Sequence, residues 1–330
     1  MNSRADFLAG LTLTAAAAST APIPALGPGL RKPPMLRTGD LVGLVAPAGP
    51  LSDAEIQKGV RQVESLGLKV RLGKNASDQD GYLAGTDAQR AADFNEMARD
   101  RGVRGIIALR GGYGTMRILD HLDYRALAAD PKVILGFSDM TAVVNAIALR
   151  SGIVTFHGAV AALSTFTAVE TAYLERALMS REPIGTLHAA GSTRLRGGRA
   201  TGPLAGGNLS LVCALAGTPY AIPARGAILF LEETHEEPYR VDRMLQQLRL
   251  GGYFRDAAGI AFGACSHCDA SGPALSLPDI YADTFGAANR PALYGAQIGH
   301  IRDQWVLPVG VPATLDADAG TLSIRESAVS

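Results

Sequence analysis

The stretch Lys132-Val133-Ile134-Leu135-Gly136-Phe137-Ser138-Asp139 passes from an apolar run into a polar turn. Its β-branched and apolar residues predict a buried strand over 132–137. A helix is expected directly afterwards, over 141–149. The sequence therefore predicts a strand and a helix joined by a tight turn, with Ser138 at the tip of that turn.

The same alternation continues on both sides of this stretch. Helices are expected between short apolar strands, and the N-cap signal Ser52-Asp53-Ala54-Glu55 marks the start of the first helix. The other strands are predicted at 41–46, 69–72, 103–109 and 153–156. Strands that alternate with helices at these lengths are typical of a doubly wound, largely parallel sheet. We expect residues 35–163 to form this N-terminal α/β domain.

After Val160 the pattern changes. Residues 164–202 begin with a helical stretch and continue with short strands rich in Gly and Arg, which we interpret as a linker region. Residues 203–330 are predicted to form a C-terminal domain that mixes strands and helices. Its clearest predicted elements are strands at 227–232 and 259–264 and helices at 209–215 and 241–248.

The composition narrows the choice of partners. The chain has 330 residues, of which 47% are hydrophobic and 19% charged, which is typical of a globular protein. Lys+Arg and Asp+Glu both number 31. Without a basic excess the chain lacks the charge that a phosphate backbone requires, so we expect no nucleic-acid partner.

The three cysteines are too few for a disulfide scaffold in a chain of this size. Two of them form a lone C-x-x-C, Cys265-Ser266-His267-Cys268, which turn residues follow. No second pair completes a zinc site. We interpret this segment as a surface loop with two thiols, with a redox or metal role as the alternative. We expect the protein to need neither a metal nor a cofactor.

The first 34 residues differ from the rest. Arg4 precedes an apolar run from Phe7 to Ala18, and small residues and a Pro-rich stretch extend to Pro34. This order predicts a signal peptide and an exported, periplasmic protein, because the apolar run is too short to span a bilayer. The alternative is an Ala-rich tail on a cytoplasmic protein. We predict no membrane span elsewhere in the sequence.

Ser138 has two interpretations. A serine between an apolar strand and a helix fits a nucleophile elbow, and Gly136 leaves room for its turn. Met140 stands where the GxSxG form has its second glycine, and a Ser-Asp pair is also a common helix N-cap. From this segment alone, both roles stay open.

A nucleophilic serine needs a base and a carboxylate that orients the base. His300 follows a glycine at the end of a predicted strand, and His157 is its rival. Glu232 ends a fully apolar strand, where an acid is costly to bury unless it has a partner such as an imidazole N–H. The order Ser, acid, His along the chain is also that of the α/β hydrolases.

Motifs along the chain resemble those of the LD-carboxypeptidase family, which includes muramoyltetrapeptide carboxypeptidases and microcin C self-immunity peptidases. The resemblance covers about residues 36–322. It rests on Tyr82-Leu83-Ala84-Gly85-Thr86-Asp87, Arg110-Gly111-Gly112-Tyr113-Gly114, Gly136-Phe137-Ser138-Asp139, Gly206-Gly207-Asn208-Leu209, Leu231-Glu232-Glu233, Pro238-Tyr239-Arg240-Val241-Asp242-Arg243 and Ile298-Gly299-His300. It implies a Rossmann-like N-terminal domain, a β-rich swivelling-type C-terminal domain and an active site between them.

By this resemblance Ser138 is the nucleophile, His300 the base and Glu232 the carboxylate. The resemblance also selects Glu232 over its neighbour Glu233, a choice that strand alternation leaves open.

Further residues are candidates for the same site. The backbone N–H groups of Asp139 and Gly112 are expected to form an oxyanion hole. The alternatives for the Gly112 turn are a plain loop or a phosphate cradle. Substrate contacts are considered for Asn208, Tyr239 and Arg243, although a helix cap is favoured for Asn208 and an ion-pair network for the other two.

The expected function is hydrolysis of the bond to the terminal D-alanine of murein tetrapeptides by a serine carboxypeptidase, with the tetrapeptide as its small-molecule partner. A homodimer is left open. One alternative is a self-immunity peptidase that cleaves peptidyl-nucleotides, an activity that in this family stacks adenine on tryptophans. Trp305 is the only tryptophan in this chain, so the sequence favours murein peptides. The non-enzyme alternative is an exported solute-binding protein.

Overall fold

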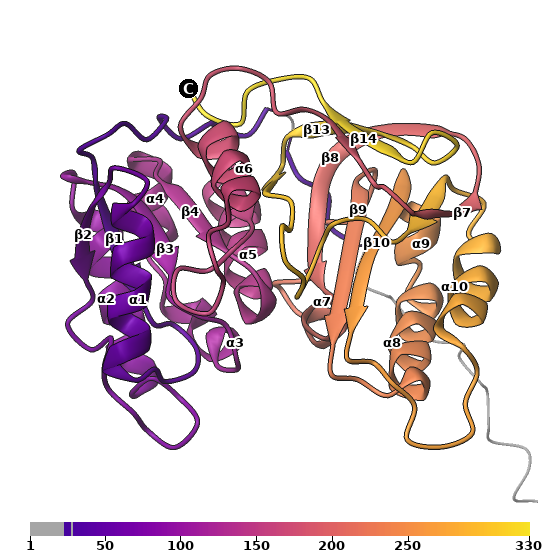
Figure 1. Cartoon of the computed structure of the whole chain (residues 1–330), viewed down its shortest axis with the longest axis horizontal. Helices are drawn as coiled ribbons and strands as arrows, with labels where there is room; N and C mark the ends of the chain where they lie inside the picture. Colours follow the sequence, from indigo (N-terminus) through magenta and orange to yellow (C-terminus); the bar gives the residue numbers. More distant parts are fainter. Residues whose placement is uncertain (1–22, 28) are drawn as a thin grey trace, which may run out of the picture.

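The computed structural model describes residues 23–27 and 29–330, so most of the predicted signal peptide lies outside the described residues. Two α/β bodies stand side by side, each built around its own sheet (Figure 1). The N-terminal sheet and its helices occupy one half of the molecule. The second sheet and the later helices occupy the other half.

The N-terminal sheet confirms the predicted doubly wound arrangement. Its parallel strands stand in the order β5–β4–β3–β1–β2. These strands are β1 (Leu41–Val45), β2 (Lys69–Leu72), β3 (Val103–Ala108), β4 (Val133–Gly136) and β5 (Thr155–His157). The helices between them are α1 (Asp53–Glu64), α2 (Asp87–Arg99), α3 (Thr115–Ile118), α4 (Tyr124–Ala129) and α5 (Thr141–Ser151). Helices on both faces bury the inner strands, which explains their continuous apolar sequences.

The other neighbour of β5 comes from far along the chain. Strand β12 (Leu307–Val309) pairs antiparallel with β5, with Leu307 opposite His157. Residues 307–309 therefore belong to the first sheet, although we predicted all of 203–330 to form the second domain. A strand of three residues carries too little pattern to reveal its partner sheet.

The second sheet is mixed, as expected for a β-rich C-terminal domain. At its centre β8 (Arg199–Asn208), β9 (Ile228–Thr234), β10 (Gly259–Ser266) and β11 (Ala292–Tyr294) run parallel. Antiparallel strands β13 (Pro312–Asp316), β14 (Thr321–Ile324), β6 (Gly185–His188) and β7 (Thr193–Arg196) complete it. Its helices are α7 (Leu209–Leu215), α8 (Pro238–Leu250), α9 (Tyr253–Asp256) and α10 (Leu277–Gly286).

Residues 164–202, interpreted above as a linker region, form regular structure. They contain α6 (Ala168–Leu178), the strands β6 and β7, and the start of β8. The two short strands lie at the outer edges of the second sheet. Because edge strands expose much of their surface, their sequences lack the apolar alternation that marks a buried strand.

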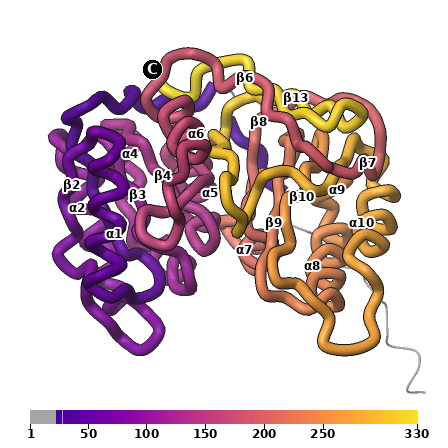
Figure 2. Tube along the Cα trace, in the orientation of Figure 1, coloured from indigo at the N-terminus to yellow at the C-terminus, as the bar shows by residue number. Residues whose placement is uncertain are grey.

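The C-terminus meets the segment that precedes β1. The C-terminal segment returns across the top of the molecule toward the N-terminal half (Figure 2). Ser330 donates its amide to the carbonyl of Pro33 and accepts one from Met35, at 2.9 and 3.1 Å. Arg31 forms a β-bridge with Ile153. This strap holds the end of the second domain against the first.

Helix α5 joins the two bodies. Buried Asn145 donates to the carbonyl of Gly206 at 2.8 Å and accepts from the amide of the same glycine at 3.3 Å. One turn earlier, the hydroxyl of Thr141 accepts the amide of Asn208 at 2.9 Å. The helix that begins just after Ser138 is therefore hydrogen-bonded to the end of β8.

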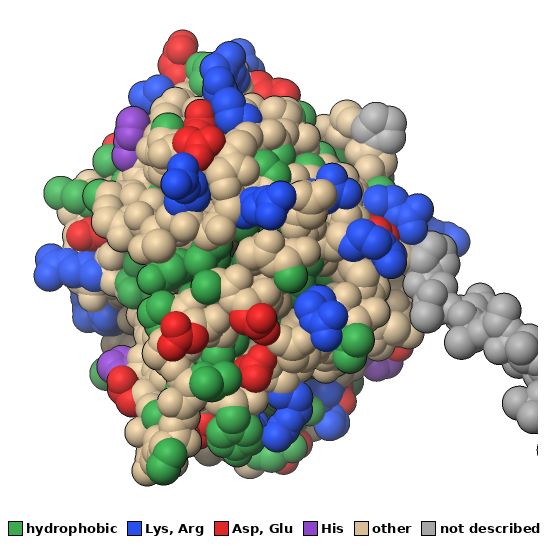
Figure 3. Space-filling model, turned by 90° about the vertical axis from the view of Figure 1, so that its right-hand side faces the viewer, with side chains coloured by type: hydrophobic (Ala, Val, Ile, Leu, Met, Phe, Trp, Pro, Cys, Tyr) green, Lys and Arg blue, Asp and Glu red, His purple; other side chains and the backbone are tan. Residues whose placement is uncertain are grey.

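The surface carries charges of both signs. On the face of the second body that carries α10, Lys and Arg side chains are interspersed with Asp and Glu (Figure 3). This agrees with the equal totals of the two charge types. None of the helices in the described part of the chain is long and apolar enough to cross a membrane.

Replacing Gly206 with alanine should destabilise the protein strongly. Gly206 has φ 137°, and a Cβ there would collide with the carbonyl oxygen of Phe230 in the neighbouring strand. We expect Gly206→Ala to lower the free energy of unfolding by about 2–5 kcal/mol, measured by urea denaturation. Gly272→Ala is the matched control, because a Cβ at Gly272 meets nothing within 4 Å. Equal stabilities of the two variants would contradict the inference that the close packing of Gly206 against Phe230 requires a glycine.

Candidate active site

Ser138 lies at the tip of a sharp turn between β4 and α5. Its backbone has φ 63°, a left-handed conformation that is rare for a residue other than glycine and is often found at functional sites. A 3₁₀ turn over Ser138–Met140 leads into the helix. A Cβ at Gly136 would lie 2.8 Å from the Cβ of Met140. Met140 thus fills the space that Gly136 leaves, which explains why the second glycine of the elbow motif is dispensable here.

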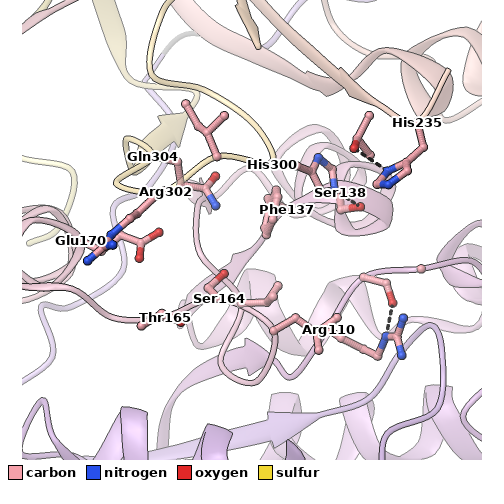
Figure 4. A pocket seen from close by; sticks show the side chains of 16 residues that line it. Arg110, Phe137, Ser138, Ser164, Thr165, Glu170, His235, His300, Arg302 and Gln304 are labelled. Atoms are coloured by element: carbon pink, nitrogen blue, oxygen red, sulfur yellow. Dashed lines mark hydrogen bonds between the residues drawn. The ribbon is translucent and has the colours of Figure 1, made fainter. Parts of the chain in front are cut away.

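The structure brings Ser138, His300 and Glu232 into one series of contacts. Figure 4 shows the first two of them, Ser138 beside His300. The hydroxyl oxygen of Ser138 lies 3.0 Å from Nε2 of His300. On the other side of the ring, Nδ1 lies 2.8 Å from Oε2 of Glu232. The hydroxyl comes from the first domain, whereas the ring and the carboxylate come from the second. An arrangement of this kind can move a proton from the hydroxyl to the imidazole.

Glu232 is fully buried near the end of β9, with 0% of its surface exposed. Its Oε1 atom has no hydrogen-bond partner among the described residues, so the imidazole is the polar contact of this carboxylate. Gly299, with φ 116°, permits the close approach, because a Cβ there would lie 2.8 Å from Oε2 of Glu232. The glycine before His300 is thus required by packing.

Glu233 points to the opposite face of the strand. Its carboxylate accepts hydrogen bonds from the side chain of Asn208 at 2.9 Å and from the hydroxyl and amide of Ser210 at 2.7 and 2.8 Å. Burial raises the pKa of Glu233, against the effect of these donors. Glu233 therefore holds the start of α7 onto β9.

His157, the rival base, makes no hydrogen bond with Ser138. Its ring is completely buried between Phe137 and Phe230, and neither ring nitrogen has a hydrogen-bond partner among the described residues. Burial lowers its pKa to about 4. This histidine is therefore a neutral core residue at neutral pH.

One candidate oxyanion donor, Asp139, follows Ser138 in the chain, and the other, Gly112, lines the cavity of Ser138. Gly111 and Gly112 both line the cavity in front of the serine, and a Cβ at Gly111 would lie 3.3 Å from the amide nitrogen of Asp139. The carboxylate of Asp139 accepts the amide of Thr115 at 2.8 Å and caps α3. Burial raises the pKa of this carboxyl group. The side chain of Asp139 is thus structural, and its backbone amide remains the candidate donor.

The serine opens into a cavity of about 740 Å³ between the two domains. Its far end carries polar residues that the sequence interpretation missed, namely Glu170, Arg302 and Gln304 (Figure 4). Glu170 lies in the first turn of α6, inside the stretch interpreted as a linker region. Arg302 and Gln304 follow His300 by two and four residues, and this proximity to the histidine was the one available signal.

The other candidate substrate contacts do not reach this cavity. Asn208 is buried and caps α7, accepting the amide of Leu211 at 3.3 Å, so the favoured interpretation was right. Tyr239 is 55% exposed on α8, and the guanidinium of Arg243 lies 5.3 Å from its ring. Neither residue lines the cavity of Ser138. The predicted substrate-binding role of these three residues therefore has no support in the structure.

The C-x-x-C segment supports the loop that carries His300. Cys265 lies in strand β10 and forms a disulfide with Cys268. The expectation of a surface loop with two thiols was therefore wrong. Between the two cysteines, the hydroxyl of Ser266 donates to the carbonyl of His300 at 3.0 Å. Within the described residues, no group of three His, Cys, Asp or Glu side chains is placed to hold a metal ion.

Models of known families match most of the chain. The model of the LD-carboxypeptidase N-terminal domain matches residues 42–158, and that of the LD-carboxypeptidase C-terminal domain matches residues 201–315. These ranges follow the two bodies of the structure.

Individual proteins are similar over nearly the full length. The "Probable murein peptide carboxypeptidase" of Bacillus subtilis is 39% identical over 302 residues, or 89% of this chain and 94% of that protein. The murein tetrapeptide carboxypeptidase of Pseudomonas aeruginosa is 32% identical, over 84% and 93% of the two chains. The microcin C7 self-immunity protein of Escherichia coli is 26% identical, over 89% and 96%.

A solved structure shares the same architecture. The crystal structure of muramoyltetrapeptide carboxypeptidase from Oxalobacter formigenes superposes with a TM-score of 0.76 at 30% identity. The match covers 87% of this chain and 100% of that one.

Buried His157 should make the protein sensitive to acid. The unfolded state binds a proton at its ordinary pKa near 6.5, whereas the folded state does so at about 4. The stability that this histidine contributes is present above pH 6.5 and is lost as the pH falls toward 4, by roughly 3 kcal/mol in all. We expect His157→Leu to flatten the fall in unfolding free energy between pH 7 and pH 4.5, measured by urea denaturation.

The control for this prediction is His188→Leu, which removes an exposed histidine from β6. If both variants lose stability with acid as steeply as the wild type, the buried ring is not the source of the sensitivity.

Proposed function

This chain belongs to the LD-carboxypeptidase family, and on that premise we propose that it is a serine carboxypeptidase that releases the terminal D-alanine of murein tetrapeptides. The observation that carries the proposal is the series of contacts from Ser138 through His300 to buried Glu232. A hydroxyl, an imidazole and a carboxylate in this order are the parts of an acyl-transfer site.

In the proposed mechanism, His300 takes the proton of Ser138 as the hydroxyl attacks the scissile carbonyl. Glu232 accepts the Nδ1–H of the imidazole, which fixes the tautomer and stabilises the imidazolium that forms. The proton then passes to the leaving amine, so that D-alanine departs and an acyl-enzyme remains. A water molecule, activated by the same histidine, releases the rest of the peptide.

The negative charge on the tetrahedral intermediate needs N–H donors. We assign them to the backbone amide of Asp139, the residue after the serine, and to that of Gly112, which lines the same cavity. The removal of one such donor typically costs about 3 kcal/mol of transition-state stabilisation. Because Gly112 has φ 116°, a side chain at this position would strain the loop that supplies the donor.

The choice of substrate rests on the relatives. The names of two of them refer to murein peptides or tetrapeptides, at 39% and 32% identity. The self-immunity protein is more distant, at 26%. Trp305 is 2% exposed and so cannot offer a face to an adenine ring, which weakens the peptidyl-nucleotide alternative. A solute-binding protein would not need the contacts between Ser138, His300 and Glu232. The family assignment also argues against this alternative.

Ser138→Ala should abolish the release of D-alanine from a murein tetrapeptide and leave the fold intact, because the nucleophile is removed and nothing else. Glu232→Gln should keep the shape of its side chain and lower kcat by about 10²–10⁴, because the imidazolium loses its stabilising charge. Released D-alanine is measured by chromatography. Turnover by Ser138→Ala near the wild-type rate would refute the mechanism.

Glu233→Gln is the matched control for Glu232→Gln, since the two acids are adjacent and both buried. We expect Glu233→Gln to lower the free energy of unfolding by about 1–3 kcal/mol, because the contacts with Asn208 and Ser210 weaken. Its kcat should stay within about tenfold of the wild type. A reversal of the two kinetic effects would mean that Glu233 orients the imidazole.

We also propose that residues 1–34 direct export, with hydrolysis of tetrapeptides in the periplasm. The Cys265–Cys268 disulfide supports this, because disulfides persist mainly in oxidising compartments. Mature protein from cell fractions should begin near Pro22 and appear with periplasmic markers, as read by N-terminal sequencing. An intact Met1 in a purely cytosolic pool would overturn the proposal.

A further inference from the structure

Arg90 is a buried arginine that the proposed mechanism leaves unused. It lies in α2 and is 1% exposed. Its guanidinium donates hydrogen bonds to three backbone carbonyl oxygens, those of Pro47, Gly85 and Gly114, at 2.5, 3.3 and 2.9 Å. It also forms an ion pair with Asp87. Because a buried charge is costly unless it is paired and hydrogen-bonded, Arg90 fixes the positions of the three loops that supply these carbonyls.

The peptide unit between Gly114 and Thr115 is held at both of its polar ends. Its carbonyl oxygen accepts from the guanidinium of Arg90, and its N–H donates to the carboxylate of Asp139 at 2.8 Å. The hydroxyl of Thr115 also donates to the backbone carbonyl of Asp139, at 2.6 Å. A cation at the oxygen and an anion at the N–H both stabilise the dipole of the peptide unit, so this unit has one favoured orientation.

The two buried charges stabilise each other across this peptide unit. Burial lowers the pKa of Arg90 and raises that of Asp139, because each charge loses its water. The charge of each residue opposes the pKa shift of the other. The loss of either charge would therefore weaken the hold of the other on the Gly114–Thr115 unit.

Arg90 also acts on the other end of this loop, through the turn after β1. Pro47 and Gly49 belong to that turn, and the amide of Gly49 donates to the carbonyl of Gly111 at 3.3 Å. The carbonyl and the N–H of a trans peptide unit point in opposite directions, so the N–H of Gly112 points away from Gly49. This N–H donates no hydrogen bond within the described part of the chain. It is therefore free for an oxygen in the cavity that Gly112 lines.

The same contacts join the loop to the nucleophile. Asp139 directly follows Ser138, and a Cβ at Gly111 would lie 3.0 Å from the hydroxyl oxygen of Ser138. The serine and the two assigned N–H donors thus belong to one packed unit. An oxyanion hole stabilises a developing charge only when its donors are oriented beforehand, and Arg90 holds this unit from the side opposite to the substrate.

We propose that Arg90 is a positioning residue of the oxyanion hole, which orients the amide of Gly112 through its contacts with Gly114 and Pro47. The inference rests on the proposed peptidase function and deepens it. Arg90 does not line the cavity, so it acts on the donors and not on the substrate. Its loss should weaken the binding of the transition state much more than the binding of the peptide.

Arg90→Lys tests this role, because an ammonium keeps the charge but lacks the planar fork that reaches three carbonyls. We expect kcat for the release of D-alanine from a murein tetrapeptide to fall about ten- to a hundredfold, with KM within about threefold of the wild type. Asp139→Asn is the second variant. It keeps an acceptor for the amide of Thr115 but loses the charge, and its kcat should fall about three- to tenfold with KM again unchanged.

A boronic acid analogue of the acyl tripeptide provides a readout that a loss of stability alone would not change. Its boron replaces the carbonyl carbon that Ser138 attacks. The serine oxygen bonds to the boron and its proton passes to His300, so that a tetrahedral boronate anion faces the assigned donors. In Arg90→Lys, the inhibition constant of this compound should rise by about the same factor by which kcat falls, measured at a temperature where circular dichroism shows a folded protein.

Arg71→Lys is the matched control, because Arg71 also pairs with a carboxylate, that of Asp100 at 2.8 Å, but lies outside the cavity. Its kcat and its inhibition constant should equal those of the wild type. Unchanged values in Arg90→Lys, or a loss expressed in KM alone, would overturn the positioning role. If Arg90→Lys does not fold, the same criteria applied to Asp139→Asn decide. A wild type that releases no D-alanine would instead refute the proposed function.

Discussion

The docking of α5 onto the end of β8 is the contact on which the site depends. Asn145 makes both hydrogen bonds of an amide pair with Gly206, and Thr141 accepts the amide of Asn208. Ser138 stands directly before α5, and Asn208 pairs with Glu232 across neighbouring strands. A few buried hydrogen bonds therefore fix the distance between the serine of one domain and the carboxylate of the other. Such buried amide contacts are specific, because a partial match would leave polar groups unpaired.

Close packing at this junction is possible because of glycines. Side chains at Gly206 and Gly207 would collide with Phe230 and Thr141, and one at Gly299 would meet Glu232. All three have φ values between 116° and 139°, which glycine adopts without strain. The glycines of the Gly-Gly-Asn and Gly-His segments are thus required by packing, whatever their functional role. They allow β8, α5 and the loop of His300 to come close enough for hydrogen bonds to form.

The electrostatics of the site follow from burial. Glu232 has no access to water, and the imidazole of His300 compensates for part of that cost. His157, equally buried but without a partner, stays neutral because burial lowers its pKa to about 4. Two histidines thus differ in role because only one has a carboxylate and a hydroxyl within reach. The disulfide turn around Ser266 adds a further constraint by holding the backbone of His300.

The sequence alone determined the first sheet and the elbow at Ser138, because apolar strands and helix caps are local signals that a buried parallel sheet makes strong. The family motifs also named Ser138, Glu232 and His300 in advance. Tertiary structure decided what local patterns do not contain. It paired β12 with β5 across about half the chain and placed β6 and β7 at the edges of the second sheet. It also turned Glu232 toward His300 and Glu233 away, and it brought Glu170 into the cavity with Gln304. These outcomes depend on contacts between residues that are distant in sequence, and such contacts leave no periodic trace in either segment.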